Sequence, residues 1–520
     1  MGASNRQTTA GDIETSSQFE QLPPNDKFKS KRGRCKHCNV EMAWNITLNL
    51  RPHLAGKCFK YNPKKRETPI TFYFEPANAS AEELFAYAVF TFTTNFRQFE
   101  SLEWKLFFKK IGFKPPTRNE LIYKNECWLD KIYDTTKLRV RQIADDATHI
   151  QLVCDGSSNI TKDRVENISF LVDKISYYWQ TTKVDGTGAT TAGSDWSKSH
   201  IINAATDITR DRLHRWTAFS SDTDSAQQKL WSLIAQDSTT KHVLSVPCDS
   251  HGLQLVMKDL LWPSKDQSKE QITTKMSSFW RDFPCELVTY FSSAPKELAY
   301  VRDAMRAVSG KISALISTVK TRWGTQARSI KSVINNKVAL QAYANNPAAA
   351  PTWKPKLLDE VNWQMLNCLY STIYPIHEHQ KMSESNRATL DKVYPRWMKI
   401  NEHMQEKRLP QAGPFSSDID EYCKRAGIGG WSHRMGRQLR PLHLTAYVLN
   451  PAYYKDKLLP SFQELLEDFI EERCGTAGIE QYYEYRTRSG RFNAEKRCWK
   501  SFADKPKLFW MSSVSCTFEF

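Results

Sequence analysis

The chain has 520 residues, of which 40% are hydrophobic and 12% aromatic, so it has enough apolar material for the cores of about three or four domains. No stretch approaches the roughly 18 uninterrupted apolar residues of a membrane helix, and the N-terminus lacks the apolar segment of a secretory signal. We therefore exclude membrane and secreted proteins and expect an intracellular protein. The twelve cysteines of such a chain predict reduced thiols and metal ligands rather than a disulfide framework.

The net charge is +16, and much of it lies in one segment. Residues 27–66 contain twelve Lys or Arg residues and one acid, Glu41. A concentrated positive charge attracts polyanions because each neutralised phosphate releases counterions, so nucleic acid is the expected partner. A solvated basic linker or a nuclear import patch is the alternative interpretation of a basic run taken alone.

Residues 1–26 are polar and predict a disordered tail. Four metal-binding side chains follow in the basic segment, spaced C-x2-C-x14-H-x4-C: Cys35, Cys38, His53 and Cys58. Zinc takes four tetrahedral N or S ligands, two from a tight turn and two from a helix face, and this spacing supplies both. Leu48, Leu50 and Leu54 can pack under the metal. The alternative is four unrelated side chains in a basic loop.

Trp44, the C-x2-C turn and the LxxHLxxxC ending at 50–58 resemble a BED-type zinc finger, a DNA-binding module often found at the N-terminus of hAT superfamily transposases. The resemblance implies structural Zn²⁺, double-stranded DNA as the partner and a location in the nucleus. The finger's helix would then face the DNA groove and read base edges, while basic side chains before it would hold phosphates. The base-reading candidates are Asn45, Thr47, Asn49 and Arg51, and the phosphate-binding candidates are Lys29, Lys31, Arg32 and Arg34.

Helical patterns begin after a linker. Ser80 and Glu83 have the spacing of a capping box at a helix start. A second helix stops at Gly112. It carries an apolar stripe at i, i+3, i+4 and i+7 that we expect in the core: Trp104, Phe107, Phe108 and Ile111.

Strand patterns replace the helical ones from residue 149. HIQLVCDG at 149–156 and the residues from 164 to 180 predict strands, and RWTAFSSD at 215–222 and HVLSVPC at 242–248 predict two more, with helical segments between them. Strands followed by alternating helix and strand indicate a mixed α/β sheet.

Beyond about residue 260 the strand signals end. Helical periodicity continues for nearly two hundred residues and predicts an all-α block. In one of its helices we expect a single apolar face to contain Val361, Met365, Cys368 and Leu369.

CDSHGLQL at 248–255 holds Cys248 and His251 at the spacing of half a zinc site. Nearby in the sequence we find neither a second such pair nor the third ligand of a catalytic zinc, so we exclude zinc here. The run resembles instead a hAT motif of Cys-x2-His followed by an apolar helix, which lies beside the active site of that family's RNase H-like domain. Further segments resemble hAT motifs in the family's order: LVCDGSSN at 152–159, AFSSDTDSAQ at 218–227, TRWGTQ at 321–326 and LHLTAYVLNPAYY at 442–454.

This resemblance implies DNA strand cleavage and joining by two Mg²⁺ ions held on carboxylates. It places the first two acids at Asp155 and Asp222, at the ends of adjacent strands, and His251 near the scissile phosphate. Asp224 competes with Asp222, and a buried His near a helix N-cap is the alternative for His251. Ser157 stands where the family usually has Trp.

The family's third acid is a Glu on a helix that follows a Pro-and-Trp segment. KPKLFW at 505–510 resembles that segment, and no such Glu follows it. Loss of one metal ligand normally lowers the catalytic rate by orders of magnitude, so we expect a catalytically inactive protein. Mg²⁺ would be a cofactor only of an active enzyme. The family's dimerisation surface would be lost with the same region, which would weaken a homo-oligomer.

The expected fold class is α+β or α/β multidomain, with a small ββα-type zinc finger and then an RNase H-like mixed sheet that carries a large all-α insertion. The predicted parts are a tail (1–26), the finger (27–60), a linker (61–78), a helical region (79–145), the RNase H-like core (146–262), the all-α insertion (263–440), a partial C-terminal hAT region (441–510) and a tail outside the family (511–520).

Three functions stay open. We expect zinc-dependent DNA binding by an inactive transposase-derived protein. The first alternative is an active hAT-type transposase whose third acid is Glu464, Glu467 or Glu484. The second is a structural scaffold whose helical block recruits other chains.

Overall fold

The structure is a computed structural model that describes most of the chain. No helix among the described residues is long and apolar enough to cross a membrane. The described residues are 16, 18–23, 31–37, 39–45, 50, 53–54, 79–92, 94–159, 161–184, 194–263, 273–318, 324–385, 388–427, 429–493, 499 and 506–511.

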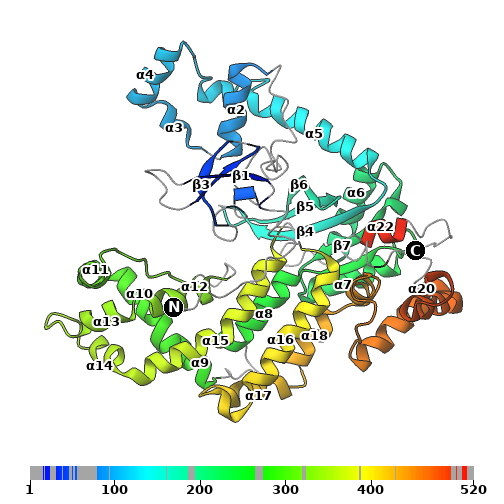
Figure 1. The fold of residues 1–520 in the computed structure, drawn as a ribbon. Helices are drawn as coiled ribbons and strands as arrows, with labels where there is room; N and C mark the ends of the chain where they lie inside the picture. Colours follow the sequence, from blue (N-terminus) through cyan, green and yellow to red (C-terminus); the bar gives the residue numbers. More distant parts are fainter. Residues whose placement is uncertain are drawn as a thin grey trace. The chain divides into compact units, whose positions relative to one another are not determined.

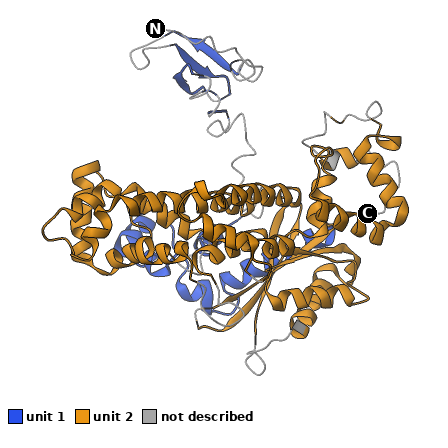
Figure 2. Ribbon diagram, turned by 90° about the horizontal axis from the view of Figure 1, so that it is seen from below, with its two compact units in different colours: residues 1–146 blue, residues 147–520 orange. Residues whose placement is uncertain are grey.

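The chain divides into two compact units, residues 1–146 and residues 147–520 (Figure 2). The first unit contains a three-stranded sheet and several helices, and the second contains a five-stranded sheet and the larger helical part (Figure 1). The predicted mixture of helices and strands is therefore confirmed at this coarse level.

The small sheet of the first unit is antiparallel, in the order β1-β2-β3. Its strands are β1 (Phe19–Leu22), β2 (Arg32–Cys35) and β3 (Glu41–Ala43). Among the described residues, Phe19, Cys35, Leu50 and Leu54 form its core, with Met42 and Trp44 packed against them.

The helices that the structure describes in the first unit include α2 (Ala81–Thr91), α3 (Phe96–Phe99), α4 (Leu102–Ile111), the π-helix η6 (Asn119–Tyr123) and α5 (Trp128–Asp146). The Ser80 half of the predicted capping box is confirmed, because Ser80 Oγ accepts a hydrogen bond of 3.1 Å from the Glu83 N–H. Gly112 ends α4 with a φ of 69°, as its position predicts.

The predicted core stripe on α4 is only partly correct. Phe108 is buried and contacts Phe85 of α2 edge to face. Phe107 and Ile111, however, are 50% and 56% exposed. α4 buries only one narrow edge, which packs against the aromatic side chains of α2 and α3. The predicted apolar stripe is wider than this contact, so part of it is exposed to solvent.

The sheet of the second unit has the order β6-β5-β4-β7-β8. Its strands are β4 (Ile150–Ser158), β5 (Arg164–Val172), β6 (Ile175–Lys183), β7 (Trp216–Ser221) and β8 (Leu244–Pro247). The pairs β4–β5 and β5–β6 are antiparallel, and the pairs β4–β7 and β7–β8 are parallel. The four segments predicted as strands all lie in this sheet.

Helices follow the strands as predicted: α6 (Ser194–Thr209), the short η8 (Leu213–Arg215), α7 (Ser225–Gln236) and α8 (Asp249–Leu261). Trp231 of α7 donates its indole N–H to Ser221 Oγ at 2.9 Å, so α7 covers the sheet face that also carries Phe219. Cys248 is the N-cap of α8, and its N–H donates to the Ser221 carbonyl at 2.9 Å. The start of α8 is therefore attached to the end of β7.

Gly252 lets α8 approach its neighbours closely. A Cβ atom at this position would lie 2.3 Å from Gln438 Oε1 and 3.1 Å from Trp397 Cζ2. Asp259, near the other end of α8, accepts two hydrogen bonds from Arg434, at 2.6 and 2.9 Å. The helix is thus held against the helical block along its length.

Beyond residue 263 the described residues contain no strand, as predicted for the all-α block. Buried residues of this block and of α8 form one continuous core. The helices are α9 (Lys275–Trp280), η9 (Arg281–Cys285), α10 (Glu286–Ser293), α11 (Pro295–Ser309), α12 (Thr325–Asn335), α13 (Lys337–Ala344), α14 (Trp353–Leu358), α15 (Glu360–Ser383), η10 (Leu390–Lys392), α16 (Val393–Lys407), η11 (Pro410–Ala412), α17 (Ser416–Lys424) and α18 (Trp431–Gln438).

The apolar face predicted for α15 is displaced. Leu369 is buried, but Val361 is 56% exposed. The buried stripe contains Trp363, Leu366 and Ile373 as well, so it is rotated relative to the face that Val361 suggested.

The last described elements are α19 (Pro441–Val448), α20 (Pro460–Thr487), η12 (Gly490–Phe492) and α22 (Pro506–Met511). An aromatic cluster joins them, formed by Tyr454, Tyr485, Phe492, Trp499 and Phe509. Trp510 of α22 donates its indole N–H to the Leu449 carbonyl at 2.9 Å.

We predict that Gly252→Ala destabilises the protein, because overpacking against Trp397 and Gln438 costs about 1–3 kcal/mol and outweighs the gain in helix propensity. Thermal unfolding followed by circular dichroism should show a lower Tm. Gly436→Ala is the matched control within α18, where an added Cβ meets nothing within 4 Å. The control should leave the Tm unchanged or raise it. Equal effects of the two substitutions would contradict the close contact at Gly252.

Candidate functional site

The small sheet brings together the two described members of the predicted zinc motif. Cys35 at the end of β2 is fully buried, and His53 is 4% exposed. The His53 ring contacts the Phe19 ring edge to face with centroids 5.8 Å apart, and Phe19 is the cross-strand partner of Cys35. Two side chains 18 positions apart in the sequence therefore converge on one residue of a small core.

A tight turn follows Cys35, as a C-x2-C knuckle requires. The Asn39 N–H donates to the Cys35 carbonyl at 2.9 Å, and the Cys35 N–H donates to the Val40 carbonyl at 3.0 Å. Asn39 has a φ of 61°, a conformation that Asn tolerates better than most residues. Cys38 and Cys58 lie outside the described residues. The donor types and burial of Cys35 and His53 fit a zinc ion.

The candidate DNA-contacting residues are only partly described. Arg34 Nη2 lies 2.8 Å from Glu41 Oε1 and Nη1 lies 3.4 Å from Glu20 Oε2, and Arg32 also pairs with Glu41. These two arginines are therefore engaged by carboxylates of adjacent strands. The hydrogen bond from Arg34 and the charges of both arginines lower the pKa of Glu41. Lys31 and Asn45 are described as well, and Lys29, Thr47, Asn49 and Arg51 lie outside the described residues.

The second candidate site lies on the sheet of the second unit. Val153 of β4 is the parallel partner of Ser220 of β7. Asp155 and Asp222 each follow two positions later, so both belong to the same face of two adjacent strands. His251 in the first turn of α8 also reaches this point, with its Nδ1 at 3.4 Å from Asp222 Oδ2. The structure thus brings the three predicted side chains together.

The electrostatics of this site oppose ionisation. Loss of water raises the pKa of Asp222, and the negative charges of Asp155 and Asp224 raise it further, while His251 lowers it. Partial loss of water around the carboxyl group of Asp155 raises its pKa, while the charge of His251 lowers it. Burial lowers the pKa of His251. Loss of water thus disfavours the charged forms of all three side chains.

The structure distinguishes Asp222 from its competitor. Asp224 is the N-cap of α7, and its Oδ1 accepts a hydrogen bond of 2.8 Å from the Gln227 N–H. It therefore has a structural role, whereas Asp222 faces His251. Cys248 also has a structural position at the N-cap of α8, and burial raises the pKa of its thiol to about 11. A thiol that stays protonated is a poor metal ligand.

Sequence reasoning missed a polar network beside Asp155. Asn167 of β5 is the cross-strand partner of Asp155 and donates from Nδ2 to the Asp155 carbonyl at 3.3 Å and to Ser157 Oγ at 3.1 Å. Its Oδ1 accepts a hydrogen bond of 2.6 Å from Thr181 Oγ1. The signal was an Asn within a run of strand-forming residues, on the face opposite the buried Ile168.

A cavity of about 1040 Å³ opens on the same face of the sheet. Gln151, Val153 and Ser220 line it from the strands. Ser250 at the start of α8 lines it from another side and donates to Glu384 Oε1 at 2.7 Å. The acid side chains therefore lie on the face of the sheet to which this cavity opens.

The alternative third acids, Glu464, Glu467 and Glu484, lie on α20. Glu467 Oε1 accepts hydrogen bonds from Gln463 at 2.6 Å and from Tyr483 at 2.5 Å. Glu484 lies against Gly490, where an added Cβ would be 2.5 Å from its carboxyl group. Within the described residues, no group of three or more His, Cys, Asp or Glu side chains has the geometry to hold a metal ion.

We predict that Asp222→Asn lowers the pKa of His251, because the Asp222 charge is the strongest interaction that favours the imidazolium. Titration of the His251 ring signals by NMR measures this pKa, with His251→Gln to assign them. Asp224→Asn should lower the same pKa less, and Asn keeps the α7 cap intact. An unchanged His251 pKa in Asp222→Asn would contradict the contact.

No protein-family model and no curated protein sequence matches this chain. The functional conclusion therefore rests on the motifs and the geometry of the chain itself.

Proposed function

We propose that the chain is a transposase-derived protein that binds double-stranded DNA in the nucleus through a zinc-dependent N-terminal module. The observation that carries the proposal is the burial of Cys35 and His53, from the two halves of the C-x2-C-x14-H-x4-C motif, in one small core beside Phe19. The predicted finger spans only residues 27–60, and a module of this length is typically stabilised by a metal. The basic charge of residues 27–66 supports DNA as the partner.

The second unit supports the transposase part of the proposal. A five-stranded mixed sheet with Asp155 and Asp222 on adjacent parallel strands is what an RNase H-like nuclease site needs from its scaffold. Two carboxylates and a neutral His251 leave a pair of Mg²⁺ ions under-neutralised. We therefore propose a remnant of a strand-cleaving site that no longer cleaves DNA.

DNA binding by the full chain tests the first part. Fluorescence anisotropy with a fluorescein-labelled 30-base-pair duplex should show binding that weakens steeply with salt, by about one logarithmic unit per logarithmic unit of salt for each phosphate neutralised. Removing zinc with a chelator should weaken binding at least tenfold, and added Zn²⁺ should restore it. Cys35→Ser should have the same effect as the chelator.

Cys474→Ser on α20 is the matched control, because this half-buried cysteine lies outside the motif. It should bind DNA as the unmodified chain does. Duplex binding that survives both chelation and Cys35→Ser would refute zinc-dependent binding.

An active transposase is the second candidate, and the shared register of Asp155 and Asp222 favours it. Nicking of supercoiled plasmid in Mg²⁺ by the full chain distinguishes the two. We expect no nicking above that of Asp155→Asn, which serves as the control for contaminating nuclease. Nicking lost in both Asp155→Asn and Asp222→Asn would establish the active enzyme instead.

A further inference from the structure

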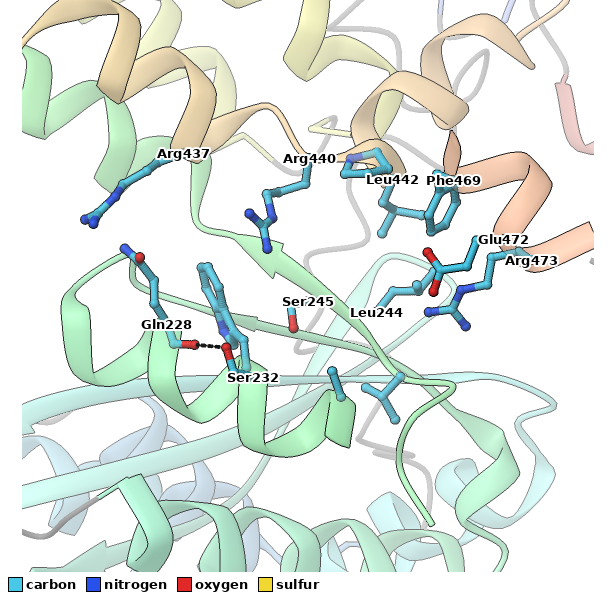
Figure 3. A pocket seen from close by; sticks show the side chains of 14 residues that line it. Gln228, Ser232, Leu244, Ser245, Arg437, Arg440, Leu442, Phe469, Glu472 and Arg473 are labelled. Carbon is cyan, nitrogen blue, oxygen red and sulfur yellow. Dashed lines mark hydrogen bonds between the residues drawn. The ribbon is translucent and has the colours of Figure 1, made fainter. Parts of the chain in front are cut away.

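A second hollow in the second unit lies away from the acid site, beside β8, the last strand in the order of the sheet (Figure 3). It has a volume of about 440 Å³. Residues of α7, β8, the end of α18, the start of α19 and α20 surround it. Asp155, Asp222 and His251 do not line this groove, so it is separate from the acid site.

The floor of this groove is apolar. Trp231 and Val243 are buried beneath it, and Leu244, Leu442 and Phe469 are half-buried along it. A concave apolar surface of this kind accommodates apolar side chains of a ligand. It does not suit a DNA duplex, which presents its phosphates on a convex surface.

The rim is basic. Arg437, Arg440 and Arg473 line the groove, and Figure 3 shows Arg437 and Arg440 extending toward α7 and β8. Glu472 is the one acid among the lining residues. The rim therefore has an excess of positive charge over an apolar floor.

These three arginines are not neutralised within the described part of the chain. Arg440 lies over the Trp231 ring at 6.0 Å and Arg473 over the Phe469 ring at 5.6 Å, and none of the three forms an ion pair with a described carboxylate. Some other arginines of this unit are paired, such as Arg434 with Asp259 and Arg408 with Asp420. Guanidinium groups left unpaired at a concave surface are available for carboxylates of a partner.

The fourth side of the groove is an edge strand. β8 is the last strand in the order β6-β5-β4-β7-β8, and Val243, Leu244 and Ser245 line the groove in succession. An edge strand offers main-chain hydrogen bonds to an added strand, with alternate side chains of that strand directed into pockets.

We propose that this groove binds an extended peptide segment of a partner protein in which acidic and apolar residues alternate. Its backbone pairs with the β8 edge. Its apolar side chains enter the floor between Trp231 and Phe469, and its carboxylates pair with Arg437, Arg440 and Arg473. The proposal is independent of DNA binding by the N-terminal module.

Selection of a phage-displayed library of random 12-residue peptides on the full chain tests this. We expect enrichment of peptides that combine Asp or Glu with apolar residues. Fluorescein-labelled copies of the enriched peptides should bind with salt-sensitive affinity and lose at least tenfold in affinity for Arg440→Glu/Arg473→Glu. Hydrogen exchange should show protection by the peptide at residues 228–235 and 243–246.

Arg302→Glu on α11 is the charge-matched control, since Arg302 is exposed and lies outside the groove. It should retain peptide affinity, and circular dichroism should verify that all variants are folded. Selected peptides without acidic enrichment, or equal binding by the double variant, would overturn the proposal. The same would follow if a labelled DNA duplex bound the Cys35→Ser chain and lost affinity in Arg440→Glu/Arg473→Glu, because the groove would then be a nucleic-acid surface.

Discussion

The parallel pairing of β4 with β7 is the constraint on which the acid site depends. It places Asp155 and Asp222 at the same level of one sheet face, where loss of water and mutual repulsion raise the pKa of Asp222. A carboxyl group whose pKa is raised on folding binds more protons in the folded state, so its contribution to stability falls as pH rises through that pKa. Fold stability alone does not explain such a pair. Paired acids with raised pKa values are typical of functional sites, which supports the proposed remnant of a strand-cleaving site.

The helical block determines where the third member of the site lies. α8 is fixed at its start by the hydrogen bond from Cys248 to Ser221 and along its length by Gly252 and the Asp259–Arg434 pair. Asp249 adds a hydrogen bond of 2.7 Å from the Trp397 indole and an ion pair with Arg396. The position of His251 against Asp222 therefore depends on how α8 packs between the sheet and the helical block. The residues of that block that hold α8 lie more than 140 positions further along the chain.

Local signals in the sequence were sufficient for the elements but not for their burial. The caps at Ser80 and Gly112 and the strand ends depend on neighbouring residues, so they could be predicted. The Asp224–Gln227 spacing before an amphipathic run was likewise an N-cap signal, and it would have separated Asp224 from Asp222 at once. By contrast, Phe107 and Val361 are exposed because the width and rotation of a helix contact depend on which other elements pack there. The hydrophobic periodicity of a single helix does not show how wide its contact is or how the helix is rotated. The partnership of Asn167 with Asp155 similarly depends on strand register.

An arginine is available to a partner only if no carboxylate of the chain already pairs with it. The number of basic residues in a segment therefore does not show where a partner can bind. The basic segment appeared as an almost unopposed run, yet Glu41 and Glu20 engage Arg32 and Arg34 within the sheet. These arginines first hold three short strands together, and DNA would have to compete for them. The groove beside β8 contributes little to the net charge by number, but its three arginines contact aromatic rings or solvent instead of carboxylates. A partner that supplies carboxylates gains more from each of these unpaired guanidinium groups than from an arginine whose charge is already balanced.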